Sequence, residues 1–449
     1  MGAIRKQIKK ITSRLSPPAI LALGFGFLVL LGTILLNLPI ATNSGQSIGI
    51  INAFFTAASA VCVTGLVVVN TAEFWSLFGK TVLIILIQIG GLGFMTMATI
   101  VALMLGRKIK LKGMLTIKEQ LNQENLSGLT RLTKYIILVT FAMELVGALL
   151  LSTRFIPIYG WSRGIGYSVF HSISAFCNAG FDILGNSMVP FVGDIVVNMT
   201  LGLLIVLGGL GFGVYADYYK QRGFKKLTLH SKLVLVMAVV LILLGALLFF
   251  VIEYNNPLSI GALSGSKKVT ASVFQSIVAR TAGFNSVDIS LIRDTSAFLL
   301  IILMYIGGAP GSTAGGIKTT TFGVLILTAI STIKGDEDVV VFKRRISENV
   351  VKKALTIVVI SLSWIILTSF LLTITEDMDF LDLLFETTSA FATVGLSRGV
   401  TLFLSPLGKL IIAITMYIGR VGPLTMAFAL SRSSGKKKYR YSEENITVG

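Results

Sequence analysis

Four glycines stand next to last in closely similar stretches, and the chemistry of these stretches would come from the backbone. They are Gly65 in FFTAASAVCVTGL, Gly180 in VFHSISAFCNAGF, Gly283 in SVFQSIVARTAGF and Gly395 in LFETTSAFATVGL, at intervals of a little over 100 residues. Glycine adopts backbone angles that side chains forbid, so it can turn successive carbonyl oxygens toward one axis. A ring of such oxygens replaces the water around a cation without a fixed charge. The pattern predicts a cation filter with one glycine per stretch.

The expected cation ligands are backbone oxygens from three residues of each stretch: Val63, Thr64 and Gly65; Asn178, Ala179 and Gly180; Thr281, Ala282 and Gly283; Thr393, Val394 and Gly395. The short helix before each glycine would aim the negative end of its dipole at the ion. A single glycine of this kind would more often serve close helix packing. Four copies in phase favour the filter.

The elements that hold these stretches must lie in a membrane. The chain has 449 residues, of which 54% are hydrophobic and only 13% charged, as in multispanning membrane proteins. Apolar windows of about 20 residues predict eight spans. They are residues 19–38, 81–104, 135–153, 195–216, 232–252, 297–330, 354–374 and 408–430. The sixth is too long for one helix and is interrupted.

The spans and the glycine stretches combine into one repeated unit. A second glycine-containing stretch follows each filter stretch, inside the later span: IQIGGLGFMT, IVLGGLGFGV, MYIGGAPGST and MYIGRVGPLT. We therefore expect an all-α polytopic protein of four parallel helix, pore loop and helix repeats around a central pore, rather than inverted repeats. The repeats are residues 19–104 (pore loop 53–66), 135–216 (169–181), 232–330 (272–284) and 354–430 (384–396).

The basic residues predict the orientation. A net charge of +18 could indicate a nucleic-acid partner in a soluble protein. Here, however, 28 of the 39 lysines and arginines lie in residues 1–18, 105–134, 217–232, 331–353 and 431–449. The positive-inside rule places these segments and both termini in the cytoplasm of a multi-pass cell-membrane protein, with no nucleic acid. The opening RKQIKK precedes a retained helix rather than a cleaved signal peptide.

The interrupted sixth span contains GGAPGSTAGGIKTTT, residues 307–321. Glycine and proline at this density prevent a regular helix. We expect an intramembrane loop below the filter, with Ser312, Thr313 and Thr319 offering hydroxyls to a water-filled cavity. GSTAGGIKT nearly matches a phosphate-binding loop, but Ile317 displaces Lys318 and no βαβ unit surrounds it. The sequence therefore predicts no nucleotide on this chain.

Charged residues in apolar surroundings are further candidates. Arg420 needs pairing or hydration, so it should face the pore or form a structural salt bridge. Arg280 should brace the third filter loop through carbonyls or a carboxylate, or else repel ions directly. Glu144 and Glu386 are expected internal partners of buried polar groups, and the sequence does not indicate of which ones. On the outer side, the acids of EDMDFLD (376–382) and Glu253 could concentrate cations, or could form a solvated loop.

At these stretches the chain resembles the superfamily of Trk, Ktr and HKT potassium transporters, most closely the Ktr membrane subunit. FQSIVARTAGFN, residues 274–285, is the most specific match. The resemblance implies transport of K⁺, because Gly65 keeps the potassium-type residue where sodium-passing members have serine. It also implies that Na⁺ stimulates transport, that the loop gates the pore and that Arg420 acts as an electrostatic plug. The implied gating residues are Gly307, Gly308, Ala309, Pro310, Gly311, Ser312, Thr313, Ala314, Gly315, Gly316, Lys318 and Arg420.

The resemblance further implies a homodimer on a ring of cytoplasmic nucleotide-binding regulatory subunits of the RCK type. The short basic cytoplasmic segments would suit a docking face. The tail GKKKYRY, residues 435–441, could equally bind anionic lipid.

Two other function classes remain open from the residues alone. A proton-coupled solute carrier would need an essential membrane-embedded carboxylate, for which Glu144 is the candidate. A membrane enzyme would need clustered polar groups at one depth, and the sequence indicates no such cluster. Cys62, Cys177, His171 and His230 lack the spacing of a metal site or disulfide framework.

Overall fold

The computed structural model describes residues 16–93, 96, 111–120, 129–430, 442, 444, 446 and 447. Most of the predicted segment 1–18, the end of the predicted span 81–104, parts of 105–134 and most of the basic tail lie outside the described residues. Within them the protein is helical apart from one two-stranded hairpin, β1 (Val340–Val341) and β2 (Arg344–Arg345).

Among the described residues, four helices are long and apolar enough to cross a membrane. They are α2 (Pro17–Leu36), α8 (Leu129–Tyr159), α12 (Leu229–Glu253) and α16 (Glu348–Thr375). Two begin at side-chain caps: Ser16 Oγ accepts from the amide of Ala19, and Thr228 Oγ1 accepts from that of Ser231. Such caps satisfy amides that the first helical turn leaves free. These helices match the first, third, fifth and seventh predicted spans.

The other four predicted spans contain shorter or broken helices: α5 (Leu77–Leu92), α10 (Ile195–Gly209) with α11 (Phe212–Gln221), α14 (Asp294–Tyr305) with α15 (Thr319–Lys334), and α19 (Pro406–Val421) with α20 (Pro423–Leu430). Gly211 has a φ of 86°, and the chain bends by 88° between α10 and α11. Counting that bent pair as one span, the described chain offers five spanning elements. The prediction of eight spans therefore remains a prediction.

Each predicted repeat contains a short helix between its long first helix and its second helix. The short helices are α3 (Ile50–Cys62), α9 (Trp161–Phe176), α13 (Gly265–Val278) and α17 (Phe380–Ala392). Helices α3 and α17 end immediately before their filter stretches, whereas one residue separates α9 from its stretch and two separate α13 from its own. The end of α3 at Cys62 is the one that the sequence predicted. Each short helix begins earlier in the chain than the predicted pore loop. Its first turn is polar or lies near the surface, so the sequence pattern of the pore loop did not include it. The C-terminal halves are buried.

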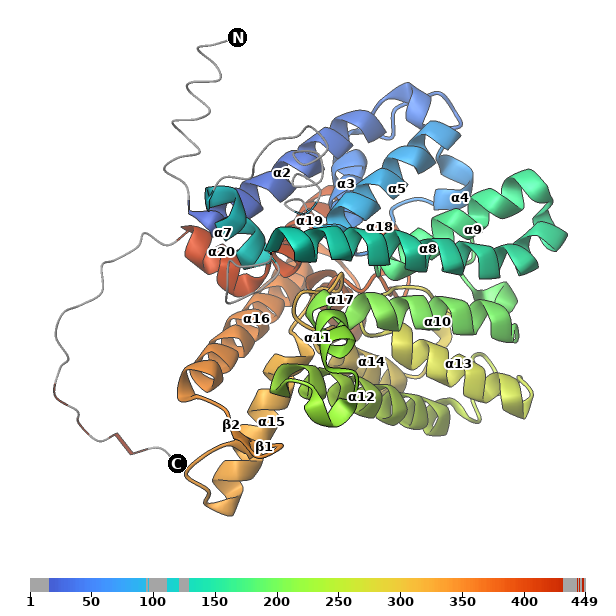
Figure 1. Cartoon of the computed structure of the whole chain (residues 1–449). Coiled ribbons are helices and arrows are strands. Elements are labelled where there is room, and N and C mark those ends of the chain that lie inside the picture. Colours follow the sequence, from blue (N-terminus) through green and yellow to red (C-terminus); the bar gives the residue numbers. More distant parts are fainter. Residues whose placement is uncertain are drawn as a thin grey trace, which may run out of the picture.

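For description we group the elements into unit 1 (17–93), unit 2 (129–221), unit 3 (229–334) and unit 4 (348–430). In Figure 1 the colours run from blue for unit 1 through green and yellow to orange-red for unit 4, and the short helices α9 and α13 lie at the right of the view. The smaller elements are η1 (Pro39–Ala41), α4 (Thr71–Phe74), α7 (Leu111–Gln120), η2 (Val189–Phe191), η3 (Phe224–Lys226), η4 (Ile289–Leu291) and α18 (Val400–Phe403).

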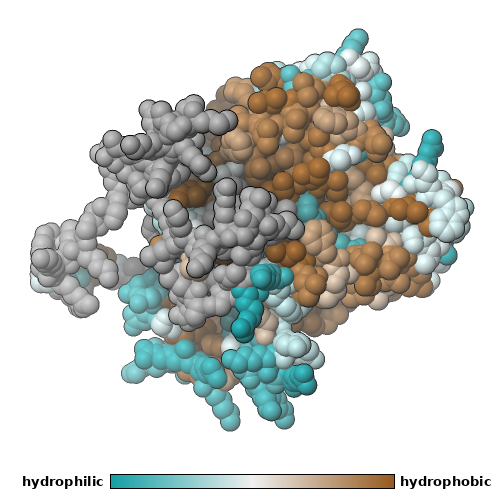
Figure 2. Space-filling model, turned by 45° about the horizontal axis from the view of Figure 1, so that its top comes forward, coloured by the Kyte–Doolittle hydropathy of each residue, from teal (hydrophilic) through white to brown (hydrophobic). Residues whose placement is uncertain are grey.

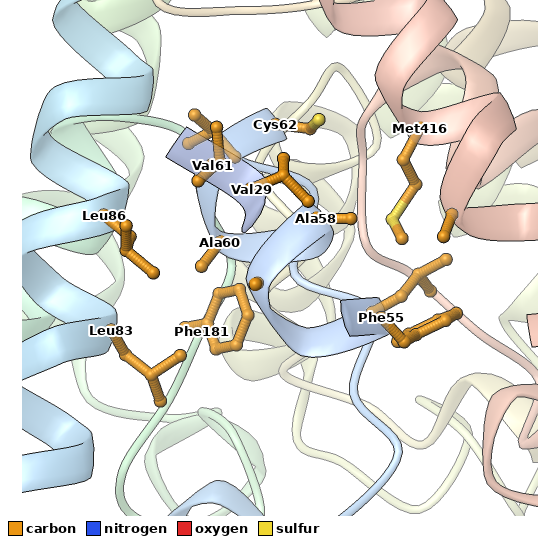
Figure 3. Close-up of a cluster of buried hydrophobic side chains, with 14 of the residues drawn as sticks. Val29, Phe55, Ala58, Ala60, Val61, Cys62, Leu83, Leu86, Phe181 and Met416 are labelled. Atoms are coloured by element: carbon orange, nitrogen blue, oxygen red, sulfur yellow. The ribbon is translucent and has the colours of Figure 1, made fainter. Parts of the chain in front are cut away.

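The short helices form the centre of the core. Figure 3 shows α3 enclosed by Val29 of α2, Leu83 and Leu86 of α5, and Met416 of α19. Phe181, which follows the filter glycine of unit 2, belongs to the same buried cluster. Residues from three units thus pack around one short helix, so burial of apolar area ties the units together.

The outer surface of the long helices is apolar. Large hydrophobic side chains are exposed along α8 and α12, among them Leu138, Leu145, Leu243 and Leu247. Figure 2 shows a broad hydrophobic face with hydrophilic residues gathered at its ends. An apolar surface of this extent is typical of a protein whose solvent is lipid.

Two acids that the sequence placed in an outer acidic cluster or a solvated loop are instead structural. Glu253 is fully buried and accepts from the amide of Arg293 at 2.9 Å, next to the start of α14. Glu376 is 9% exposed and accepts from the amide of Ser405 at 2.9 Å, at the start of α19. The prediction was wrong for both residues, because the beginning of a helix presents free amides that a buried carboxylate can satisfy.

Candidate cation site

The structure brings the four sequence-predicted glycines together in a closed ring. A Cβ atom built on Gly65 would lie 3.2 Å from the Cα of Gly180, and one on Gly180 would lie 2.8 Å from that of Gly283. A Cβ on Gly283 would lie 3.2 Å from the Cα of Gly395, and one on Gly395 would lie 3.0 Å from that of Gly65. Each unit therefore touches the next, and unit 4 closes on unit 1.

Carbonyl oxygens crowd every glycine of this ring. The same Cβ atoms would overlap the carbonyl oxygens of Ala179, Ala282, Val394 and Thr64, the residues that precede the glycines. No larger residue fits without moving the backbone. The four oxygens thus lie together where the loops meet, and an arrangement of this kind can coordinate a cation.

The backbone angles follow one pattern in all four loops. Each glycine has a positive φ, between 67° and 93°, and so does the residue two positions earlier: Val63, Asn178, Thr281 and Thr393. The residue between them does not. Non-glycine residues adopt positive φ only where surrounding structure imposes it. The repeated pattern indicates a shared, enforced loop geometry.

Backbone amides of the loops are tied to the short helices. The amides of Thr64, Ala179 and Val394 donate to the carbonyls of Ser59, Ser174 and Ser389, at 2.8, 2.7 and 2.9 Å. This bond, five residues back, is a helix C-cap of the Schellman type. It directs the amides outward and leaves the loop carbonyls free for the centre.

Sequence reasoning missed a serine brace. The amide of Gly65 donates to Ser59 Oγ at 3.1 Å, and that of Gly395 donates to Ser389 Oγ at 3.0 Å. In unit 2, Ser174 Oγ donates to the carbonyl of Phe181 at 2.8 Å. The signal was available, because a serine stands six residues before three of the four glycines. Unit 3 has Ile277 there.

The predicted break in the sixth span is confirmed: α14 ends at Tyr305, α15 begins at Thr319, and the residues between them form a loop. The amide of Ala309 donates to the carbonyl of Gly209 at 2.9 Å, and that of Phe212 donates to Gly311 at 3.0 Å. Thr313 Oγ1 donates to the carbonyl of Phe176, at the end of α9, at 3.1 Å. The loop therefore lies against the bend of unit 2 and the base of its filter stretch.

The loop also reaches the filter stretch of unit 4. A Cβ built on Gly315 would overlap Thr393 Oγ1, and one on Gly316 would lie 3.3 Å from the Cβ of Ala392. Glycines at both positions allow the loop to approach the end of α17. The residues predicted to gate are thus adjacent to residues predicted to bind the ion.

One prediction about the loop hydroxyls was partly wrong. Ser312 lines a cavity of ≈ 240 Å³, together with Lys318 and Arg420. Thr313 and Thr319 are 1% and 0% exposed, and neither lines that cavity. Thr313 is turned toward the end of α9 by its hydrogen bond, and Thr319 begins a helix, so packing buries both.

Arg420 joins the loop to unit 1. Its guanidinium donates to the carbonyl of Thr313 in the loop and to those of Gly90 and Gly91 in α5, the last at 3.1 Å. The residue is half-buried. In the described chain it forms no ion pair, and carbonyl oxygens stand where the salt-bridge alternative expected a carboxylate. Carbonyl oxygens satisfy the buried donors of the guanidinium instead.

The expected internal carboxylates bind uncharged groups. Glu144 is bound by Gln88 Nε2 at 3.3 Å and lies beside Cys177 Sγ. Glu386 is bound by Ser397 and Thr401. Arg280 does donate to a carbonyl, as predicted, but that of Ala238 on α12 at 3.2 Å. The packing of neighbouring elements determines which groups these side chains bind, and no sequence pattern indicates those partners.

The comparisons with known proteins agree with this architecture. A family model described as TrkH, a cation transport protein, matches residues 28–439. The chain belongs to the TrkH family of cation transport proteins. It is 44% identical to Ktr system potassium uptake protein B of Bacillus subtilis (strain 168), over 97% of each chain. It is 40% identical to the potassium/sodium uptake protein NtpJ of Enterococcus hirae, over 98% of this chain and 99% of that one.

A solved member of the TrkH family has the same fold. The crystal structure of the potassium transporter TrkH from Vibrio parahaemolyticus aligns with a TM-score of 0.70 and 17% sequence identity, covering 91% of this chain and 84% of that chain. The resemblance predicted from the four glycine stretches is therefore confirmed at the level of the family. The protein is a helical membrane protein of that family, whereas the individual filter and gate residues stay predictions.

Proposed function

We propose that this chain is the ion-translocating membrane subunit of a potassium uptake system, and that K⁺ passes through the ring formed at Gly65, Gly180, Gly283 and Gly395. The single observation that carries the proposal is the closure of that ring, with four carbonyl oxygens crowded around four glycines. Backbone oxygens without fixed charge suit a weakly hydrated monovalent cation that must bind and leave quickly.

The relatives support K⁺ as the substrate, because both curated relatives take up potassium by name. The name of one also includes sodium, so Na⁺ either permeates or stimulates uptake. The three-residue ligand sets predicted from the sequence form the proposed filter, and the four predicted ranges form repeats around one pore with eight spans. In this proposal both termini and the basic segments face the cytoplasm.

The proposed gate is the loop of residues 307–318 with Arg420. Its support is position: the loop touches the bases of two filter stretches, and Arg420 fastens it to α5. Gating by a cytoplasmic nucleotide-binding regulatory subunit, and a homodimer of this chain, complete the proposal. A loop with this many glycines can change conformation at low energetic cost.

The test is uptake by cells that lack their own potassium uptake. The wild-type chain, with and without a co-expressed regulatory subunit, should restore growth at low potassium. Gly65→Ser adds a side chain that overlaps the Ala179 carbonyl, so the K⁺ to Na⁺ uptake ratio should fall at least about tenfold, equivalent to ~1.4 kcal/mol.

The matched control is Gly45→Ser. Gly45 also has a positive φ, of 69°, but a Cβ there meets nothing within 4 Å. Its uptake ratio should equal that of the wild type. An unchanged ratio in the Gly65 variant would contradict the filter. If wild-type uptake instead required a proton gradient and Glu144→Gln abolished it, the carrier alternative would replace this proposal.

A further inference from the structure

The four filter loops differ in the side-chain contacts that hold the segment following each filter glycine. Nine residues before the glycine, the short helices carry Thr56, His171, Phe274 and Glu386 in units 1 to 4. In all four this position lies in a buried part of the helix. In units 2 and 4 the side chain reaches forward, past the filter stretch, to the residues that follow the glycine.

In unit 4 the forward contact is a carboxylate. Glu386 is fully buried on α17, and its Oε2 accepts from Ser397 Oγ at 2.7 Å. Its Oε1 accepts from Thr401 Oγ1, and the two hydroxyls lie 3.1 Å apart. Ser397 stands two residues after Gly395. Glu386 therefore links helix α17 to the segment that follows the proposed filter.

In unit 2 the forward contact is an imidazole. His171 is fully buried on α9, and its Nδ1 lies 2.7 Å from the carbonyl of Tyr167. A carbonyl can only accept, so Nδ1 carries the hydrogen and Nε2 is the acceptor. The amide of Ile183, three residues after Gly180, donates to that Nε2 at 3.4 Å.

Units 1 and 3 have no such contact. Thr56 Oγ1 donates backward to the carbonyl of Asn52 in its own helix. The side chain of Phe274 has no polar atom. The segment that follows Gly283 in unit 3 is held instead by unit 2, where Ser187 Oγ accepts from the amide of Asn285 at 3.0 Å. Because the ring runs through units 1, 2, 3 and 4 in order, units 2 and 4 lie opposite each other.

We propose that Glu386 and His171 are positioning residues that fix two opposite filter loops and so set the preference for K⁺ over Na⁺. The inference rests on the proposed filter function. To bind the smaller sodium ion well, the carbonyl ring must contract. Tethering opposite loops to buried helices opposes that contraction, as second-layer contacts hold a binding site in its productive geometry.

The test uses the full-length protein reconstituted in liposomes, with uptake of Rb⁺ measured in competition with Na⁺ and with K⁺. Glu386→Met removes both acceptors at similar size, whereas Glu386→Gln keeps one acceptor and adds a donor that either hydroxyl can meet. The Met variant should lose Rb⁺ over Na⁺ preference by about tenfold, and the Gln variant by no more than about threefold.

His171 offers a second variant that preserves packing. It contacts the rings of Phe155, Tyr167, Phe170 and Phe284, so His171→Phe keeps an aromatic side chain there and removes both hydrogen bonds. It should lower the preference by about threefold to tenfold. Ser397→Ala combined with Thr401→Val leaves Glu386 in place and should reproduce the Glu386→Met result if that variant fails to fold.

Glu376→Met is the matched control. It removes a buried carboxylate of the same unit that binds the start of α19 rather than the segment after the filter glycine. It should therefore lower the melting temperature without changing ion preference. Equal loss of preference in this control would overturn the proposal, as would unchanged preference in folded Glu386→Met and His171→Phe proteins. A wild type with no potassium preference would refute the proposed function instead.

Discussion

At the scale of the residue, Arg420 has the most consequential contacts outside the ring. A cation inside an apolar helix is unfavourable by at least ~2.5 kcal/mol unless its donors are satisfied. Here carbonyls from two units satisfy them, and one belongs to the loop that we propose as the gate. The arginine thus holds the loop in the position that the structure shows while its own donors find acceptors.

Arg420→Ala should therefore increase uptake in the absence of any regulatory subunit. Hydrogen bonds from a charged donor contribute about 1.5–3 kcal/mol, so loss of the contact to Thr313 should raise the open population about tenfold or more. Initial rates of Rb⁺ uptake into liposomes measure this. Lys353→Ala removes a cation from the wall of the same cavity and should leave the rate unchanged. An equal increase in both variants would assign the effect to cavity charge rather than to the loop.

At the scale of the element, units 2, 3 and 4 fasten the start of the second helix to the end of the first, and unit 1 fastens it to η1, which follows the first helix. The residue that caps the second helix makes the contact each time. Ser76 Oγ donates to the carbonyl of Ile40, Asp194 pairs with Arg154 at 2.7 Å, the amide of Arg293 donates to Glu253, and Ser405 donates to Glu376. The contact is the same in position but different in chemistry. These clamps set the spacing of the two helices that flank each short helix.

Loss of a clamp should reduce stability. Glu253→Ala removes the acceptor of the buried Ser296 hydroxyl and of the Arg293 amide, and one of the two acceptors of Asn256, so the free energy of unfolding should fall by about 2–3 kcal/mol. Thermal unfolding in detergent, followed by circular dichroism, should show a lower midpoint. Asp377→Ala changes an exposed acid near the equivalent end of α16 and should have no effect. A normal midpoint for the Glu253 variant would mean that the clamp does not contribute to stability.

At the scale of the whole molecule, charge and hydropathy together predict orientation. The basic segment 331–353, which includes the β1–β2 hairpin, should face the cytoplasm. The loop between α2 and α3 should lie on the other side, where all four short helices begin. This arrangement would let K⁺ enter the ring from outside and leave past the gate loop.

Cysteine labelling tests this orientation directly. The chain has two cysteines, Cys62 and Cys177, and both are 0% exposed, so the wild type should not react with a membrane-impermeant maleimide. Gln46→Cys should be labelled in intact cells, and Glu337→Cys only after permeabilisation. Both positions are exposed. Labelling of Glu337→Cys in intact cells, with none at position 46, would reverse the proposed topology.

The sequence by itself determined the long helices, the end of α3 at its filter stretch and the break between α14 and α15. These features depend on local composition: apolar runs of spanning length, a glycine at a fixed place, and glycines with a proline that prevent a helix. The serine six residues before three of the glycines is an equally local pattern, but the sequence predictions did not include it. The family followed from the same stretches.

Only the tertiary structure decided which groups meet. Arg420 and Gly90 are 330 residues apart in the chain, and nothing local distinguishes a carbonyl partner from a carboxylate. The order of the ring, the burial of Thr313 and Thr319, the clamps at Glu253 and Glu376, and the contacts of His171 and Glu386 share this origin. A buried polar group binds whichever partner the packed units bring within about 3 Å, and that partner is set by how the units assemble.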